Sequence, residues 1–275
     1  MPATLLSHQA LVLPLKMRWP HRFSGLALCI GSMVPDFEFI WRMTDDWIFS
    51  HTMAAQAWFT VPVTVTLVWL VTRLAIPTLL PYVGEVDSLR LHDLAAIRRP
   101  SRLSDWVSVA CSAWIGGMSH VLLDAVTHGN HSGWLVPHFP VLRAPIDHFG
   151  AERPLYDVLQ IWFTLTFAAA SLVMWRHIAR HRLLWRWQQR PVEPRRSKPR
   201  RAGTMLAAFS LSGALLGATV GHRAHEHAPP KAFAAAIAFG ALDFAAGTLL
   251  LAAVALRARQ RGSPVGTLAS ARVSS

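Results

Sequence analysis

The chain has 275 residues, of which 52% are hydrophobic and only 15% are charged, whereas charged residues make up about 25% of soluble domains. Its 27 Lys and Arg residues outnumber 15 Asp and Glu residues, and the basic residues gather in patches between apolar runs, as in integral membrane proteins. This distribution argues against a soluble nucleic-acid-binding protein, and the two cysteines support neither a disulfide framework nor a thiolate metal site.

Apolar segments of membrane-spanning length recur along the chain, since about 20 apolar residues cross a hydrocarbon core. The first segment, 23–41, is the weakest, because Pro35, Asp36 and Glu38 prevent its second half from facing lipid. Five further segments carry almost no charge: 52–72, 106–123, 158–175, 202–221 and 232–256. We therefore predict an all-α fold, a polytopic membrane bundle of about six transmembrane helices.

The basic patches predict the orientation and the division of the chain. If both termini are cytoplasmic, all Lys- and Arg-rich loops fall on the cytoplasmic side. We expect a site-bearing membrane domain, a basic cytoplasmic linker, a C-terminal transmembrane hairpin and a disordered tail, over residues 1–175, 176–202, 203–257 and 258–275. Within the first domain, the sequence predicts a short interfacial helix at 84–100 and a flexible polar loop at 129–157.

The strongest chemical pattern is formed by His120, Asp124 and His128, which follow one another at intervals of four residues. On a helix this spacing places imidazole, carboxylate and imidazole along one stripe. A carboxylate at a span end is costly in lipid and is usually functional. We interpret the three residues as ligands of a divalent metal ion, the alternative being a polar stripe for helix packing.

Two further groups fall on the same predicted side of the membrane. In Pro35-Asp36-Phe37-Glu38 the proline can unwind the backbone and turn one carboxylate inward. Asp36 is the candidate ligand, and Glu38 a positioning residue or a general base; the alternative is a charged helix end at the outer interface. His51 opens the next span, where a single histidine is commonly interfacial.

His8 lies apart from these candidates in the charge pattern. It precedes Lys16 and Arg22, so that a simple hairpin places it in the cytoplasm. It joins the other candidates only if residues 5–15 re-enter the membrane as a broken helix, which Pro14 permits. Spacing alone gives no reason to count His8 as a ligand.

Four strings occur in order along the chain: Ser7-His8, Gly31-Ser32-Met33-Val34-Pro35-Asp36-Phe37-Glu38, His51, and Gly117-Met118-Ser119-His120 through Thr127-His128-Gly129. Together they resemble the bacterial membrane-protein family catalogued as domain of unknown function 4184, over most of residues 1–175. The pattern is also similar to membrane-bound metal-dependent hydrolases and, more distantly, to zinc-dependent phospholipase C and nuclease folds. The resemblance implies a re-entrant start, or a site nearer mid-membrane, and a site made of six residues: His8, Asp36, His51, His120, Asp124 and His128.

The expected function is that of a metal-dependent hydrolase in the cytoplasmic (inner) membrane of a bacterium. Nitrogen and oxygen ligands favour zinc, with manganese or iron as alternatives, and Glu38 would accept the proton of the metal-bound water. The expected partners are membrane lipids and a lipid-linked phosphoester substrate, with no nucleic acid. A proton- or cation-coupled transporter and a non-catalytic membrane scaffold are the alternatives.

Overall fold

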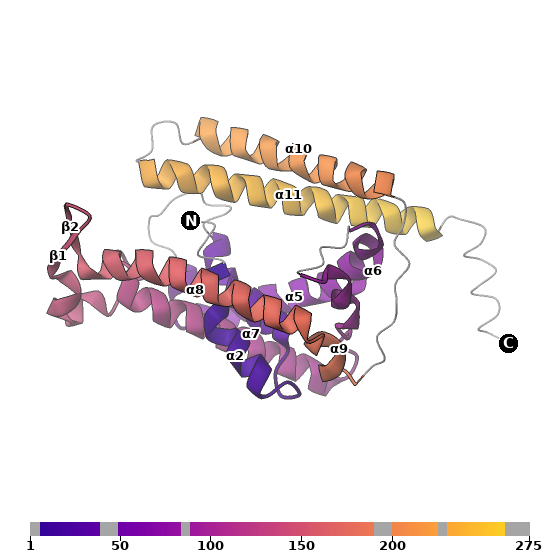
Figure 1. Ribbon diagram of the computed structural model, residues 1–275, viewed down its shortest axis with the longest axis horizontal. Helices are drawn as coiled ribbons and strands as arrows, with labels where there is room; N and C mark the ends of the chain where they lie inside the picture. Colours follow the sequence, from indigo (N-terminus) through magenta and orange to yellow (C-terminus); the bar gives the residue numbers. More distant parts are fainter. Residues whose placement is uncertain (1–5, 39–48, 84–88, 190–199, 225–229, 262–275) are drawn as a thin grey trace.

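Helices dominate the structure, as the sequence predicts (Figure 1). The computed structural model describes residues 6–38, 49–83, 89–189, 200–224 and 230–261. Its α-helices are α2 (Gln9–Arg18), α3 (Gly25–Gly31), α5 (Val61–Leu70), α6 (Ile76–Leu79), α7 (Leu103–Thr127), α8 (Leu155–Arg180), α9 (Leu183–Trp187), α10 (Arg200–Ala224) and α11 (Pro230–Arg261). Short 3₁₀ turns are η1 (Val34–Asp36), η2 (Phe49–His51), η5 (Leu80–Tyr82), η6 (Leu91–Ala96), η7 (Val136–His138) and η8 (Pro140–Arg143), and π-helical turns are η3 (Gln56–Thr60) and η4 (Val71–Ala75).

Three helices within the described residues are long and apolar enough to cross a membrane: Gln56–Tyr82, Leu103–Thr127 and Leu155–Arg180. They lie where the sequence predicts spans at 52–72, 106–123 and 158–175, and each continues several residues further. Helices α10 and α11 cover the last two predicted segments. That these two helices also cross the membrane stays a prediction; with them the spans would number five, and the predicted total of about six also needs the first segment to cross.

The predicted first span at 23–41 is wrong in its described part. Helix α3 ends at Gly31, and the 3₁₀ turn η1 follows, with Pro35 inside it; residues 39–41 lie outside the described part. Pro35 lacks a backbone donor and cannot continue the hydrogen-bonding pattern of an α-helix. Helix α2 has 10 residues and a length of about 15 Å, half of a hydrocarbon core. Helices α2 and α3 therefore form a hairpin whose limbs are too short to span a membrane.

Two connecting regions also differ from the expectation. The loop 129–157 contains an antiparallel hairpin, β1 (Pro145–His148) and β2 (Ala151–Pro154), in which Pro145 pairs with Pro154. Its turn residues Phe149 and Gly150 both have positive φ angles, 56° and 78°, the combination that closes a tight hairpin. The predicted interfacial helix at 84–100 is represented by the short turn η6, while residues 84–88 lie outside the described part.

The ends of the predicted regions lie partly in helices. The last residues of α8, up to Arg180, and the whole of α9 lie inside the range 176–202 predicted as a linker. Helix α11 likewise continues to Arg261, into the predicted tail 258–275. The remainder of both regions falls largely on residues outside the described part, so that their division stays a prediction.

Helix α3 lies at the centre of the packing. On one side Cys29 packs with Leu13 of α2 and Ile178 of α8. On another side Ala27 packs with Val68 of α5 and Val109 of α7. Helices α10 and α11 form a separate hairpin that contacts the chain near α6 (Figure 1). The half-length helix α3 is thus held by three long helices.

Two glycines bring the backbones of α3 and α7 into direct contact. A Cβ added to Gly31 would lie 2.5 Å from the Ala113 carbonyl oxygen, and one added to Gly116 would lie 2.6 Å from the Leu28 carbonyl oxygen. Small residues permit such close approach between membrane helices. The backbone N–H of Ser24 also donates to Ser112 Oγ at 2.9 Å. This contact sets the distance between the end of α3 and the last turns of α7.

Replacing Gly116 by alanine should therefore separate α3 from α7. The added methyl group would meet the backbones of Leu28 and Ser32, and such overpacking costs about 1–3 kcal/mol of the free energy of unfolding. Gly247→Ala in α11 is the matched control, since no described atom lies within 4 Å of its added Cβ. Thermal unfolding in detergent should show a lower midpoint for Gly116→Ala only; an unchanged midpoint would contradict the close packing.

Candidate metal centre

Four side chains from separate elements direct nitrogen and oxygen atoms at one point. Asp36, His51, His120 and Asp124 each offer one ligand atom within 4.8 Å of all the others. His120 Nε2 lies 3.2 Å from His51 Nε2 and 3.2 Å from Asp124 Oδ2. His51 Nε2 lies 3.3 Å from Asp124 Oδ2, and Asp36 Oδ1 lies 3.5 Å from His120 Nε2 and 3.6 Å from His51 Nε2. This group could hold a metal ion.

The spacing of these atoms matches a tetrahedral ligand set. Ligands about 2.0–2.1 Å from zinc at tetrahedral angles lie about 3.3 Å from one another. Five of the six separations among these four atoms range from 3.2 to 3.6 Å, and the sixth is at most 4.8 Å. A cation also offers these atoms a common partner, whereas protonating both imidazoles would place two positive rings against each other.

Helix α7 supplies two of the four donors. His120 and Asp124 lie one turn apart on its buried face, as their spacing predicts. His120 Nδ1 lies 2.8 Å from the Ser32 carbonyl oxygen, which can only accept, so that Nδ1 carries a proton. The other nitrogen, Nε2, then faces the centre. A backbone carbonyl that orients the ring in this way is typical of metal-binding histidines.

Asp36 and His51 reach the centre from the turns η1 and η2. The backbone N–H of Ser50 donates to Glu38 Oε2 at 2.7 Å, and Ser50 Oγ donates to the Pro35 carbonyl at 2.7 Å. These bonds join the two turns beside His51, whose Nδ1 lies 3.2 Å from Ser50 Oγ. Glu38 is fully buried. Its bond to the Ser50 backbone holds the residue next to His51, as expected of a residue that positions a ligand. Its role as a general base stays a prediction.

His8 lies in the same site, contrary to the charge pattern and as the family resemblance implies. Its ring stacks on that of His120 with centroids 3.8 Å apart, and its Nε2 lies 3.7 Å from Asp124 Oδ1. Burial lowers the pKa of His8, which favours its neutral imidazole. His8, which directly precedes α2, therefore reaches the centre. It can do so although it precedes Lys16 in the chain, because α2 is too short to carry it across the membrane.

His128 departs from the predicted helical stripe. Helix α7 ends at Thr127, and His128 has extended backbone angles, φ −121° and ψ 141°. Its Nδ1 lies 3.6 Å from Asp124 Oδ1, the oxygen that faces His8. Its Nε2 lies 2.8 Å from the Gln160 side-chain nitrogen on α8. His128 thus stands beside the group of four, and the stripe predicted from spacing holds only for His120 and Asp124.

The supporting residues were not evident from the sequence. Ser32 contributes a backbone carbonyl, and a pattern of side chains cannot predict a backbone contact. Ser50 joins two turns through its backbone and hydroxyl groups, and Gln56 Nε2 donates to the Ser50 carbonyl at 2.7 Å. The available signal was position, because Ser50 directly precedes a candidate ligand and polar neighbours of ligands commonly orient them.

The comparison with protein families matches residues 1–256 to the family described as "Domain of unknown function (DUF4184)". The chain belongs to this family. Comparisons with curated proteins and with solved structures gave no match. The family predicted from the sequence strings is thus confirmed, and the match extends beyond the predicted residues 1–175. Since the family description names no activity, the reaction of this DUF4184 protein has to be argued from the site.

Removing a ligand from α7 should release the metal from this DUF4184 protein. We expect the purified wild type to hold about one ion per chain and His120→Ala and Asp124→Ala each to lose at least about tenfold in metal affinity, as even substitutions next to ligands do. His138→Ala is the control, because His138 is exposed in η7. Elemental analysis after desalting measures the content; a wild type that takes up no zinc would contradict the site.

Proposed function

We propose that this protein is a membrane-embedded, zinc-dependent hydrolase that acts on a phosphoester of a lipid or another envelope substrate. The observation that carries the proposal is the group Asp36, His51, His120 and Asp124, with zinc-like spacing. Two imidazoles and two carboxylates suit zinc, with manganese or iron as alternatives. A zinc ion in such a site supplies a nucleophilic water at neutral pH and polarises a phosphoryl oxygen.

The site has features of a catalytic rather than a structural centre. Structural zinc sites are rich in cysteine, whereas these ligands are histidines and aspartates. The Asp36 side chain is 15% exposed, against 6% or less for the other three ligands. The substrate therefore approaches from the side of Asp36, the ligand that can most readily share its position with water.

His8 and His128 extend the site beyond the four ligands. Both face Asp124 Oδ1, so that they either bind a second ion or contact the substrate. His128 has 26% of its side chain exposed, against 4% for His8. When Gln160 donates to His128 Nε2, the proton of the neutral ring resides on Nδ1. Nδ1 lies 3.1 Å from Thr127 Oγ1, which donates to the Leu123 carbonyl and can accept a hydrogen bond from Nδ1. His128 is thus the more accessible of the two histidines, but both of its ring nitrogens already have partners.

The setting of the site favours a substrate drawn from the membrane. Helix α7, which provides His120 and Asp124, is one of the apolar helices of spanning length, and the donors lie in its last turns. Membrane lipids and a lipid-linked substrate are the proposed partners, with no nucleic acid. The first of the six predicted spans does not form, so we propose five spans in the inner membrane of a bacterium, with the basic loops on the cytoplasmic side.

A hydrolysis assay tests the proposed reaction directly. Protein purified in mild detergent and loaded with zinc should hydrolyse phospholipids or a chromogenic phosphodiester, and His120→Ala should lose at least about a hundredfold, since it removes both a ligand and the bound water. Released phosphate and alcohol are measured, with His138→Ala as the control. Zinc-dependent cation flux into proteoliposomes without any hydrolysis would favour the transporter and contradict the enzyme.

The two roles of Glu38 separate in the variant Glu38→Gln. Glutamine retains an oxygen that can accept the Ser50 N–H bond but is a far weaker base than a carboxylate. If Glu38 accepts the proton of the attacking water, we expect full metal content and a loss of about 10²–10⁴-fold in hydrolysis. Unchanged hydrolysis with full metal content would leave Glu38 as a positioning residue only.

A further inference from the structure

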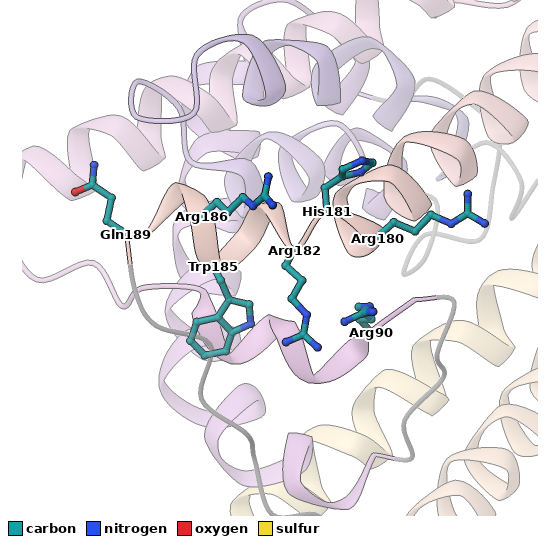
Figure 2. A pocket seen from close by; sticks show the side chains of 7 residues that line it. All are labelled: Arg90, Arg180, His181, Arg182, Trp185, Arg186 and Gln189. Carbon is teal, nitrogen blue, oxygen red and sulfur yellow. The ribbon is translucent and has the colours of Figure 1, made fainter.

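A separate pocket lies at the other end of α8 from the metal centre. The centre meets α8 near its start, at Gln160, whereas this pocket of about 340 Å³ lies where α8 ends and α9 begins. Four arginines line it, together with Trp185: Arg90, Arg180, Arg182 and Arg186. In Figure 2, Arg180 ends α8, Arg182 lies just before α9, Arg186 lies in α9, and Arg90 comes from the segment that faces them.

Positive charge predominates in this pocket. Arg182 Nη1 lies 3.9 Å from Asp93 Oδ1, and the same oxygen accepts a hydrogen bond from Trp185 Nε1 at 2.8 Å. Within the described residues the other three arginines have no ion pair. A cluster of cationic groups with a single carboxylate creates a local potential that attracts anions.

The two segments that carry the pocket's arginines, at Arg90 and at Arg182, are held together. Arg90 and Arg182 have φ angles of 45° and 49°, a backbone region that non-glycine residues rarely occupy. Their side chains approach each other beside Trp185 (Figure 2). The bond from Trp185 to the buried Asp93 fastens α9 to η6. Two guanidinium groups so arranged can each offer paired N–H donors to phosphate oxygens.

An apolar pocket adjoins the cationic one. It has a volume of about 300 Å³ and shares Arg90 with the first pocket. Its walls include Leu172, Trp175, Ile178 and Leu184. Arg90 thus stands between a cationic chamber and an apolar one, and this arrangement matches a ligand with an anionic head and a hydrocarbon chain.

The position of the two pockets at the end of α8 agrees with such a ligand. Helix α8 has 26 residues and is about 39 Å long, so that in a hydrocarbon core of about 30 Å its last turn reaches the headgroup region. We propose that the two pockets bind an anionic phospholipid, with its phosphate between Arg90 and Arg182 and an acyl chain against Leu172 and Trp175.

Native mass spectrometry of the detergent-purified full chain tests this proposal. The probes are long-chain phosphatidylglycerol, phosphatidylcholine of equal chain length, and inorganic phosphate alone. The variants are Arg90→Gln and Arg182→Gln, and Arg90→Lys keeps the charge. Arg143→Gln is the control, because Arg143 is an exposed arginine on η8, away from both pockets. The thermal unfolding midpoint measured on each sample in detergent establishes that the variant is folded.

We expect the wild type to retain phosphatidylglycerol in preference to phosphatidylcholine. Arg90→Gln and Arg182→Gln should each weaken this binding about fivefold, the usual effect of one basic residue at an anionic membrane surface. Arg90→Lys should lose less, and Arg143→Gln should match the wild type. Three results would each overturn the proposal: a loss of phosphatidylglycerol binding in Arg143→Gln as large as in Arg90→Gln, equal retention of phosphatidylglycerol and phosphatidylcholine by the wild type, or retention of inorganic phosphate equal to that of phosphatidylglycerol.

Discussion

The site depends on one hydrogen bond between two helices, from His120 Nδ1 to the Ser32 carbonyl. It forms because Gly31 and Gly116 let the backbones of α3 and α7 touch, and it gives the imidazole one orientation. Ser32 in turn precedes the turn that carries Asp36, so that the same contact brings a second donor to the centre. The close packing of α3 against α7 is therefore also what positions the candidate ligands. A wider separation of the two helices would break the hydrogen bond and move Asp36 away from His120.

Burial explains why most of the polar groups around the site are hydrogen-bonded, although His8 Nδ1 and Asp36 Oδ2 have no hydrogen-bond partner among the described residues. His120 is fully buried and Asp124 nearly so, and ionisable groups in such surroundings are stable only when they are paired or bound to a metal. Ser50, Gln56 and Glu38 form a second layer whose hydrogen bonds run between turns. A network of this kind holds donors from distant parts of the chain in one geometry, as a preorganised site requires.

The sequence predicted those features that follow from local periodicity. His120 and Asp124 were placed on one face because both lie inside a regular helix, and the three long helices follow from their apolar runs. His8 was placed on the wrong side because counting charges assumes that every segment crosses the membrane, which α2 and α3 are too short to do. The sequence predicts His128 on the helix because no proline or glycine before Gly129 indicates that α7 ends at Thr127. Convergence itself depends on long-range packing, which spacing does not encode.

The half-length hairpin has a consequence for the order of synthesis. Helices α2 and α3 leave the ribosome before α7, yet lipid alone cannot hold limbs that reach only part of the way across. Their polar residues acquire a lasting environment only when α7, about 80 residues later in the chain, is inserted beside them. The hairpin of α2 and α3 must therefore wait, sheltered by the insertion machinery or lying at the membrane surface, and the four candidate ligands come together only late in biogenesis.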